Sequence, residues 1–390
     1  MKSLSFDQCR HQLVVVTSLI LVLGAHPLTR AAEQTTDGFQ IALPGYRYQF
    51  PRDHGSHPEF KIEWWYLTGH LWTADKTRRF GYQATFFRSG VRPIEPGTKV
   101  SDTFGSDQIY LAHMTILEVE TGEFSYEERL NRNGWDASAN ESKLDVRNGN
   151  WSLVMTGDPA DESMHLVGSV RADAMFRLQL TPEKPKVLFG NDGVSRKGAD
   201  QSAASHYITF TRLQTTGTLN FHGEELSVTG QTWMDHEISS SQLSDEQVGW
   251  DWASIQLNDG TEIMVYVMRR DDGTVDPFST LAWIDETGTV SHNTPDQFSW
   301  EKSAWWKSPH SGANYPIGST LSIPHPARDQ NGQLAITLKP LTKDQEIQGE
   351  LGGIRYWEGA CDVLDESSNL IGHAYVELTG YDGKLSSTLR

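Results

Sequence analysis

Two stretches decide the fold, and they hold matching places in the two halves of the chain: Glu63-Trp64-Trp65-Tyr66-Leu67-Thr68-Gly69 and Gly249-Trp250-Asp251-Trp252-Ala253-Ser254. A polar corner follows each stretch. A strand of alternating apolar and polar residues then ends at an arginine, Arg88 in the first half and Arg269 in the second. The period of two residues is typical of a β-strand. A repeat of this length indicates a duplicated domain rather than a solenoid unit.

The hairpins continue in the same order in both halves. A third strand ends at Glu120-Thr121-Gly122 in the first half and at Glu286-Thr287-Gly288 in the second. Antiparallel chains with this many hairpins protect their edges by closing into barrels or by stacking as sandwiches. We therefore predict an all-β fold of two tandem antiparallel β-barrels packed together. The only candidate helix longer than a turn or two is residues 239–247.

The repeat also sets the predicted domain boundaries. We place a first barrel at residues 38–237 and a second at residues 238–390. Their junction, near residues 236–250, is expected to bury Trp233, Trp250 and Trp252, because tryptophans on alternating strands tend to be packed. Small closed barrels can also hold one ligand.

The composition excludes one class of partner. The chain has 390 residues, a net charge of −18 and a pI near 5.2, and no run of basic residues. Proteins that bind nucleic acid need clustered Lys and Arg, so nucleic acid is not an expected partner. Neither a phosphate-binding loop nor a GxSxG elbow occurs, so nucleotide enzymes and serine hydrolases have no local signature.

Residues 1–32 are predicted to be a cleaved signal peptide. Lys2 and Arg10 accompany the apolar run 13–25, which is short for a membrane span and is followed by Ala31-Ala32. An uncleaved anchor is the alternative. Cleavage would make the protein periplasmic or secreted, and it would leave Cys361 as the single thiol, so no internal disulfide is expected.

Three motifs resemble the carotenoid 1,2-hydratase/AttH family of lipocalin-like proteins: Glu63-Trp64-Trp65-Tyr66, Thr232-Trp233-Met234-Asp235-His236-Glu237 and Gly249-Trp250-Asp251-Trp252. The resemblance covers nearly the whole mature chain. It implies two lipocalin-like β-barrels, export in bacterial members and, for some members, an ABC transport system as partner. Many relatives are named predicted secreted hydrolases, others hydrate isoprenoid double bonds, and fungal relatives cyclise polyenes.

The hydratase branch of that family is matched in part. Its catalytic pattern is a His-x-Trp pair followed by a Tyr-x-Asp pair, and the nearest positions here are His236-x-Ile238 and Tyr266-x-Met268. Protonation of an alkene needs a positioned acid and a pocket that shields the carbocation. The resemblance therefore implies His236 and Tyr266 as catalytic residues, with Asp235 or Asp251 in place of the missing carboxylate.

The best candidate site from the residues themselves is Asp235-His236-Glu237, next to Trp250-Asp251-Trp252. Strand alternation places Asp235 and Glu237 on one face and His236 on the other. A carboxylate that faces an apolar pocket could act as acid or base, because burial raises its pKa. The alternative is an inter-domain polar network that orients the barrels. The candidate catalytic residues are His236, Asp235, Glu237, Asp251 and Tyr266.

A second set is predicted to bind ligand: Glu63, Trp65, Tyr66, His113, Trp250 and Trp252. Glu63 and Trp65 share one face of their strand, and Glu63 has a structural alternative as the ion-pair partner of Arg88. His113 has the alternative of a buried histidine whose hydrogen bonds are satisfied.

Neither a cofactor nor a metal is predicted. The histidines show neither HExxH nor Cys-x-x-Cys spacing, and His54 and His57 lie in a loop with Pro and Gly.

Three functions are considered, and one of them is carbohydrate binding by the adjacent tryptophans Trp305-Trp306, which lie near Pro309 and Gly312. The favoured function is that of an exported lipocalin-like protein that binds an apolar small molecule, a lipid or isoprenoid, in envelope transport or processing. The alternative is an enzyme of the hydratase, cyclase or hydrolase type at Asp235-His236-Glu237.

Overall fold

The computed structural model describes residues 34–93, 107–158, 160–324 and 332–385, and in these ranges the chain is almost entirely β-strand. The one helical element there is the 3-10 turn η1 (Arg52–His54). None of the helices in the described ranges is long and apolar enough to cross a membrane. The predicted signal peptide, residues 1–32, lies outside the described residues.

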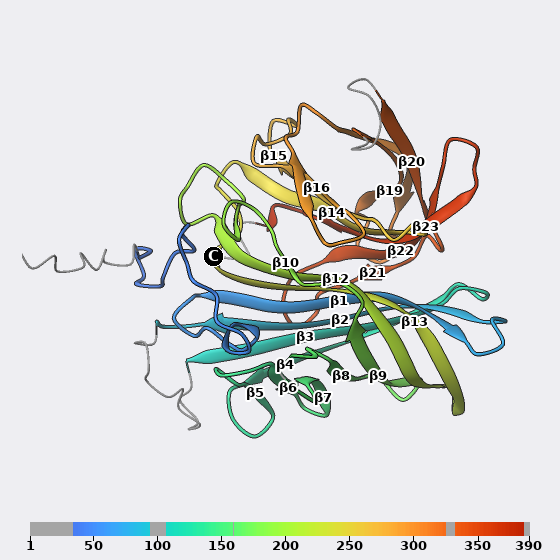
Figure 1. Cartoon of the computed structure of the whole chain (residues 1–390), viewed down its shortest axis with the longest axis horizontal. Helices are drawn as coiled ribbons and strands as arrows, with labels where there is room; N and C mark the ends of the chain where they lie inside the picture. Colours follow the sequence, from blue (N-terminus) through green and yellow to red (C-terminus); the bar gives the residue numbers. More distant parts are fainter. Residues whose placement is uncertain (1–33, 94–106, 159, 325–331, 386–390) are drawn as a thin grey trace, which may run out of the picture. The chain divides into compact units, whose positions relative to one another are not determined.

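The first sheet is antiparallel and runs in the order β4-β3-β2-β1-β13-β12-β9-β8-β7-β6-β5, with β10 and β11 paired to β12 (Figure 1). Its strands are β1 (Ile62–Thr73), β2 (Arg79–Gly90), β3 (Gln108–Glu118), β4 (Glu123–Arg132), β5 (Ala137–Ala139), β6 (Asp145–Asn148), β7 (Trp151–Met155), β8 (Met164–Val170), β9 (Ala174–Pro182), β10 (Val187–Leu188), β11 (Val194–Arg196), β12 (Ala204–Phe221) and β13 (Glu224–Ser241). The sheet curls until β3 and β4 pack against β8 and β6.

The second sheet is also antiparallel and runs in the order β17-β16-β15-β14-β23-β22-β20-β19-β18, with β21 paired to β22. Its strands are β14 (Gln247–Leu257), β15 (Glu262–Arg270), β16 (Thr280–Ile284), β17 (Val290–Asn293), β18 (Ser299–Lys307), β19 (Asn314–Pro324), β20 (Gln333–Pro340), β21 (Glu346–Ile347), β22 (Tyr356–Leu364) and β23 (Leu370–Thr379). The prediction of an all-β fold with two antiparallel barrels is confirmed.

The repeat seen in the sequence is a repeat of strand pairing. In the first sheet β1 lies between its hairpin partner β2 and the last strand β13, and in the second sheet β14 lies in the same way between β15 and β23. Tyr66 is thereby paired with Asp235, and Trp252 with Glu377. The two halves therefore place an aromatic residue beside a carboxylate at equivalent positions.

Strand alternation gives each barrel its own core. Trp65 and Met234 point into the first barrel, together with Tyr82, Trp151 and Phe176. Ala253 and Leu378 point into the second, where Trp357 is also fully buried. The residues between these positions form a third cluster, which both sheets share.

That third cluster is the junction of the barrels. Trp233 comes from β13 and Trp252 from β14, and their rings meet edge to face with centroids 6.3 Å apart. Trp233 is 1 % exposed and Trp252 is 6 % exposed, whereas Trp250 is half-buried. The junction strands are therefore covered on both faces, one by their own barrel and the other by its neighbour.

The passage between the sheets lies slightly beyond the predicted boundary. β13 continues to Ser241 and β14 begins at Gln247, whereas the sequence placed the change at 237/238. The predicted helix at 239–247 is wrong, because residues 239–241 complete β13 and the following residues form a turn. Ser239 instead donates its hydroxyl to the carbonyl oxygen of Ala204, which ties the end of β13 to β12.

Candidate functional site

A cavity of about 90 Å³ lies at the junction and takes residues from both sheets. Eight aromatic side chains line it: Trp64, Tyr66, Phe87, Tyr207, Trp250, Trp252, Tyr266 and Tyr356. Ionisable side chains are also exposed to it, namely Lys197, Asp235, Glu237 and Glu377. It combines a mainly apolar lining with a few polar groups, as ligand sites do.

Asp235 is buried in the cavity wall and is held by three donors. Tyr207 Oη donates to its Oδ2 at 2.7 Å, while Thr209 Oγ1 and Trp233 Nε1 donate to its Oδ1 at 2.6 and 2.8 Å. Burial raises the pKa of Asp235 to about 7, because the loss of hydration outweighs the hydrogen bonds that favour the carboxylate. A carboxyl group with such a pKa is able to give up or take a proton near neutral pH.

Glu237 is held in a different way, because it has a cation beside it. Lys197 Nζ lies 3.0 Å from Glu237 Oε2, and Ser205 donates its hydroxyl to the same oxygen. The ammonium group also lies over the rings of Tyr207 and Tyr266, at 4.6 and 4.3 Å from their centroids. Burial alone would lower the pKa of Lys197, but the charge of Glu237 keeps it above its ordinary value.

The second barrel contributes the carboxyl group of Glu377. Trp250 Nε1 donates to Glu377 Oε1 at 2.6 Å, and burial raises the pKa of Glu377 to about 8. Behind it, Tyr66 Oη donates to Glu358 Oε1 at 2.7 Å. Burial and the nearby charge of Glu377 raise the pKa of Glu358 well above its ordinary value. Of the cavity carboxyl groups, Glu377 is therefore mainly protonated at neutral pH, and Asp235 is close to half protonated.

His113 lies behind the cavity wall rather than in it. Its Nδ1 is 2.7 Å from the hydroxyl of Tyr356, which itself lines the cavity. On the other side, His113 Nε2 is 3.9 Å from Glu128 Oε1. Burial lowers the pKa of His113 to about 3, so the ring is neutral and positions Tyr356.

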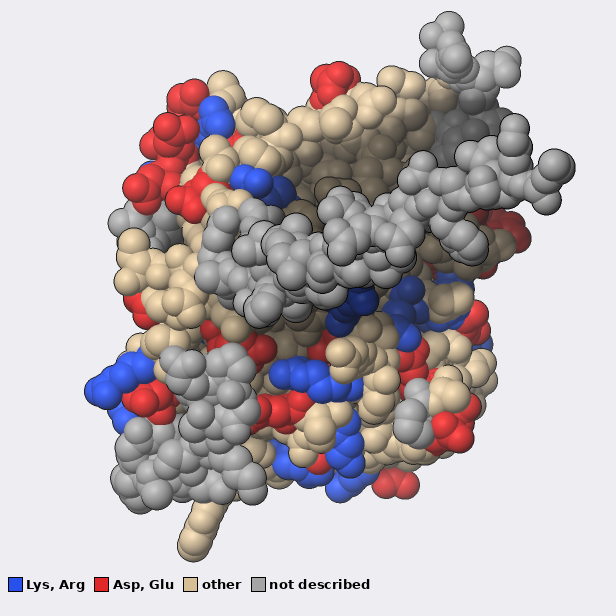
Figure 2. Space-filling view, turned by 60° about the vertical axis from the view of Figure 1, so that its left-hand side comes forward, with Lys and Arg blue, Asp and Glu red and all other residues tan. Residues whose placement is uncertain are grey.

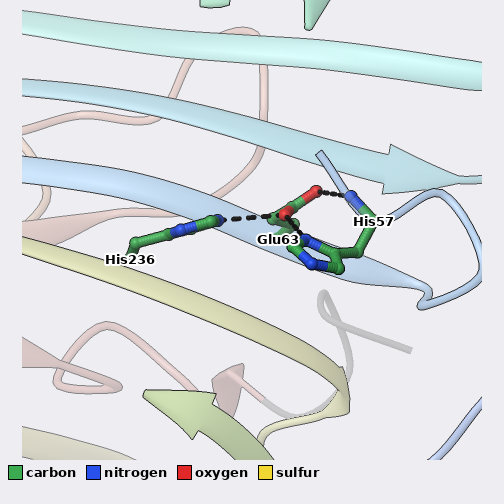
Figure 3. A group of neighbouring side chains, drawn as sticks. All are labelled: His57, Glu63 and His236. Carbon is green, nitrogen blue, oxygen red and sulfur yellow. Dashed lines mark hydrogen bonds and ion pairs between the residues drawn. The ribbon is translucent and has the colours of Figure 1, made fainter. Parts of the chain in front are cut away.

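A second buried cluster lies inside the first barrel, on the opposite face of β1 and β13 (Figure 3). Glu63 Oε1 is 3.0 Å from both His57 Nδ1 and His236 Nε2. Arg88 Nε donates to Glu63 Oε2 at 2.8 Å. The ring of His236 stacks on Trp65 with centroids 4.7 Å apart. Burial lowers the pKa of His236 to about 4, so this ring is neutral and donates to Glu63.

The atoms of His57, Glu63 and His236 lie within 4.8 Å of one another, as metal ligands would. The guanidinium group of Arg88 already supplies a positive charge to Glu63, and it is held in place by the carbonyl oxygens of His57 and Phe60. A metal ion there would face that fixed cation. The arrangement fits a structural ion-pair network better than a metal centre.

Asp251 occupies the corresponding interior of the second barrel. Its carboxylate lies 2.8 Å from Lys302 Nζ and 3.1 Å from Arg269 Nε, and Tyr381 donates to it at 2.9 Å. Burial alone would raise the pKa of Asp251, but the two cations lower it. Asp251 is therefore a buried ion-pair partner and is not part of the cavity.

The structure thus divides the predicted site residues into two groups. The cavity contains Asp235, Glu237, Tyr266, Tyr66, Trp250 and Trp252. Outside it are Glu63, Trp65, His113, His236 and Asp251. The reason is the two-residue period of the strands: neighbours of a cavity residue point into a barrel.

Sequence reasoning missed Trp64, Lys197, Tyr207, Tyr356 and Glu377 as cavity residues. The repeat carried a signal for Glu377, because Glu377 is paired with Trp252 as Asp235 is paired with Tyr66. Lys197 had no such signal, since it lies in the irregular segment between β11 and β12.

The surface agrees with the absence of a basic run in the sequence. On the face drawn in Figure 2, Lys and Arg residues are interspersed with Asp and Glu residues and do not gather into one basic patch.

Comparison with known proteins places the chain among lipocalin-like folds. A family model described as AttH-like matches residues 41–381. A crystal structure of a protein from Nitrosomonas europaea described as AttH has a TM-score of 0.75 and 31 % identity, covering 88 % of this chain and 100 % of that one. Kievitone hydratase from Nectria haematococca has a TM-score of 0.62 and 15 % identity, covering 90 % of this chain and 96 % of that one. At that identity the second likeness concerns the fold alone. No curated protein matches the chain.

Proposed function

Since this chain belongs to the AttH-like family, we propose that it is a lipocalin-like protein that binds an apolar small molecule, a lipid or isoprenoid, in the cavity between its two barrels. The observation that carries the proposal is the aromatic lining of that cavity. Indole and phenol rings offer a large apolar surface, and conjugated or branched hydrocarbons pack well against it. The carboxyl groups of Asp235 and Glu377, when protonated, would donate hydrogen bonds to a polar substituent on the part of the ligand that lies in this cavity.

We extend the proposal to the place of action. The basic residues and apolar run of the N-terminus support export to the periplasm or beyond, and the family resemblance supports a role in envelope transport or processing with an ABC transport system as partner. Recovery of the mature chain in the cytoplasmic fraction of its own cells, rather than in the periplasmic fraction or medium, would contradict this part.

A titration with a fluorescent polyene tests ligand binding. We expect saturable binding that Trp64→Ala weakens by about tenfold or more, because each 1.4 kcal/mol of lost contact energy is a factor of ten. Trp64 is half-buried and lines the cavity. Trp305→Ala is the matched control, because Trp305 is 55 % exposed on the second barrel and lies away from the cavity. Equal affinity of both variants for the polyene would refute the cavity as the binding site. If instead the protein binds a polysaccharide column and Trp305→Ala abolishes that binding, the carbohydrate-binding hypothesis is favoured.

A second candidate function is proton-transfer catalysis on the bound ligand, and the environment of Asp235 favours it. A buried carboxyl group with a pKa of about 7 faces aromatic walls. In a hydration, Asp235 would give its proton to one alkene carbon, the rings would stabilise the cation at the other, and water would add there while returning a proton to the carboxylate.

Product analysis with two adjacent variants separates a carrier from an enzyme. If the protein catalyses hydration, Asp235→Asn should lower turnover by about 10²–10⁴-fold, the range for loss of a general acid. His236→Gln should have a much smaller effect, because His236 faces Glu63 inside the first barrel. Turnover lost only in His236→Gln would contradict the assignment to Asp235. Binding without any turnover would leave the protein a carrier.

A further inference from the structure

A second cavity, of about 450 Å³, opens beside the first at the same junction. We refer to the cavity that contains Asp235 as the inner cavity and to this second one as the outer cavity. The outer cavity lies between the segment 189–196 of the first sheet and the residues 277–280 and 292–294 of the second. The inner cavity is smaller than the range of about 300–1,000 Å³ typical of small-molecule sites, and the outer cavity falls within it.

Strand β15 forms a continuous floor beneath both cavities. Met264 lines the outer cavity, Met268 lines the inner cavity, and Tyr266 between them lines both. These residues share one face of the strand, and a four-residue step along a strand spans about 13 Å. A molecule that occupies both cavities must therefore be elongated.

Tyr266 is the partition between the two cavities. Its hydroxyl is 2.9 Å from Ser195 Oγ and donates to the carbonyl oxygen of Arg196 at 3.1 Å. Both partners belong to β11, which also lines the outer cavity. The next residue, Lys197, lies over the Tyr266 ring in the inner cavity. One aromatic side chain thus separates two spaces with different linings.

The two cavities differ in charge. The lining of the outer cavity contains the cation Arg196 and no carboxylate, although the chain carries a net charge of −18, and burial lowers the pKa of its one histidine, His292. The inner cavity contains Asp235, Glu237 and Glu377. An anion inside the inner cavity would find its one ammonium group, that of Lys197, already paired with Glu237 at 3.0 Å. A negatively charged head group is therefore accommodated better in the outer cavity.

We propose that the ligand is an elongated amphiphile with a carboxylate head, which sits in the outer cavity near Arg196 while the hydrocarbon chain passes Tyr266 into the inner cavity. The proposal rests on the proposed function and specifies its ligand class. The polar groups of Ser195, Thr280 and Asn293 in the outer lining offer hydrogen bonds to the head group. The methionines and aromatic rings accept the chain.

Competition against a bound fluorescent polyene tests the ligand class on the full-length protein at neutral pH. We expect hexadecanoate to bind at least tenfold more tightly than octanoate, because octanoate is too short to span both cavities. Hexadecanoate should also bind about tenfold more tightly than hexadecanol, which has the same chain and no charge. Chain-length independence, or equal affinity for the acid and the alcohol, would overturn the proposal.

Two variants test where the carboxylate head group of the ligand binds. Arg196→Gln should remove most of the difference between hexadecanoate and hexadecanol, whereas Arg147→Gln, at an exposed arginine on β6, should leave it unchanged. Asn191→Trp should weaken both hexadecanoate and octanoate, because Asn191 is an exposed residue at the rim of the outer cavity, which receives either head group. An acid preference that survives Arg196→Gln in a folded protein would contradict the placement.

The same experiment separates failure of this inference from failure of the proposed function. If the polyene binds in a Trp64-dependent manner and hexadecanoate does not displace it better than hexadecanol, the cavity binds apolar molecules but has no carboxylate preference. If neither the polyene nor either amphiphile binds, both proposals fail.

Discussion

Replacement of Arg88 by alanine is expected to lower the free energy of unfolding by about 3–5 kcal/mol, the cost of leaving one partner of a buried ion pair alone. Arg88 is 1 % exposed, and its Nε donates to Glu63 at 2.8 Å. Burial alone would raise the pKa of Glu63, but the charge of Arg88 and the hydrogen bonds from His236 and His57 hold it well below its ordinary value. Without Arg88, the Glu63 carboxylate remains inside the barrel with too little positive charge.

Denaturant unfolding followed by tryptophan fluorescence measures this effect. Arg147→Ala is the matched control, because Arg147 pairs with Asp145 at 2.9 Å but is 51 % exposed. Exposed pairs contribute about 0–1 kcal/mol, so the control should unfold close to the wild type. Equal destabilisation by the two substitutions would mean that the Glu63 cluster does not hold the barrel. The double variant Glu63→Gln with Arg88→Met should recover part of the loss, since it leaves no unpaired charge.

The second large effect concerns pH and Asp235. The pKa of Asp235 rises from 3.8 in the unfolded chain to about 7 in the folded protein, so the folded state binds the proton more tightly. The contribution of Asp235 to the free energy of unfolding therefore falls as pH rises from about 4 to about 7. Above that range the contribution no longer changes with pH. At about 1.4 kcal/mol per pKa unit, the stability of the wild type relative to Asp235→Asn should fall by about 4 kcal/mol across this window.

A second carboxylate in the same protein is expected to give a pH dependence of stability with the opposite sign, and it serves as the control. Asp285 is a partly exposed residue that precedes a turn, and hydrogen bonds from Thr287 and Thr289 lower its pKa. Its contribution to stability is present above its unfolded pKa and is lost as pH falls. The wild type should thus gain stability relative to Asp285→Asn as pH rises, and lose stability relative to Asp235→Asn. A flat pH profile for Asp235→Asn, or one parallel to the profile for Asp285→Asn, would show that folding does not raise the pKa of Asp235.

These predictions depend on which face of a strand each residue occupies, and here the sequence was partly sufficient. The alternation of Glu63, Trp64, Trp65 and Tyr66 required that Glu63 and Trp65 share one face, and the structure has them inside the first barrel. The alternation did not say which face would meet the other barrel. Both faces are apolar enough to be buried, because the junction strands are covered on both sides.

The sequence alone therefore identified only some of the residues of the candidate site. Asp235 and Glu237 could be named from the motif, and His236 was named with them although it lies on the opposite face. Lys197 could not be found, because an irregular segment has no period from which its position follows. Its place beside Glu237 depends on how the segment after β11 folds over β13.

By itself, the sequence determined the strands, the duplication and the all-β class, since these follow from a two-residue period and from turns that act over a few residues. Only the tertiary structure decided that Asp235 of one barrel and Glu377 of the other face one cavity, and that Glu63 and Asp251 do not. The physical reason is that a side chain's burial and pKa depend on what packs against it, and here the packing partners come from strands far apart in the chain.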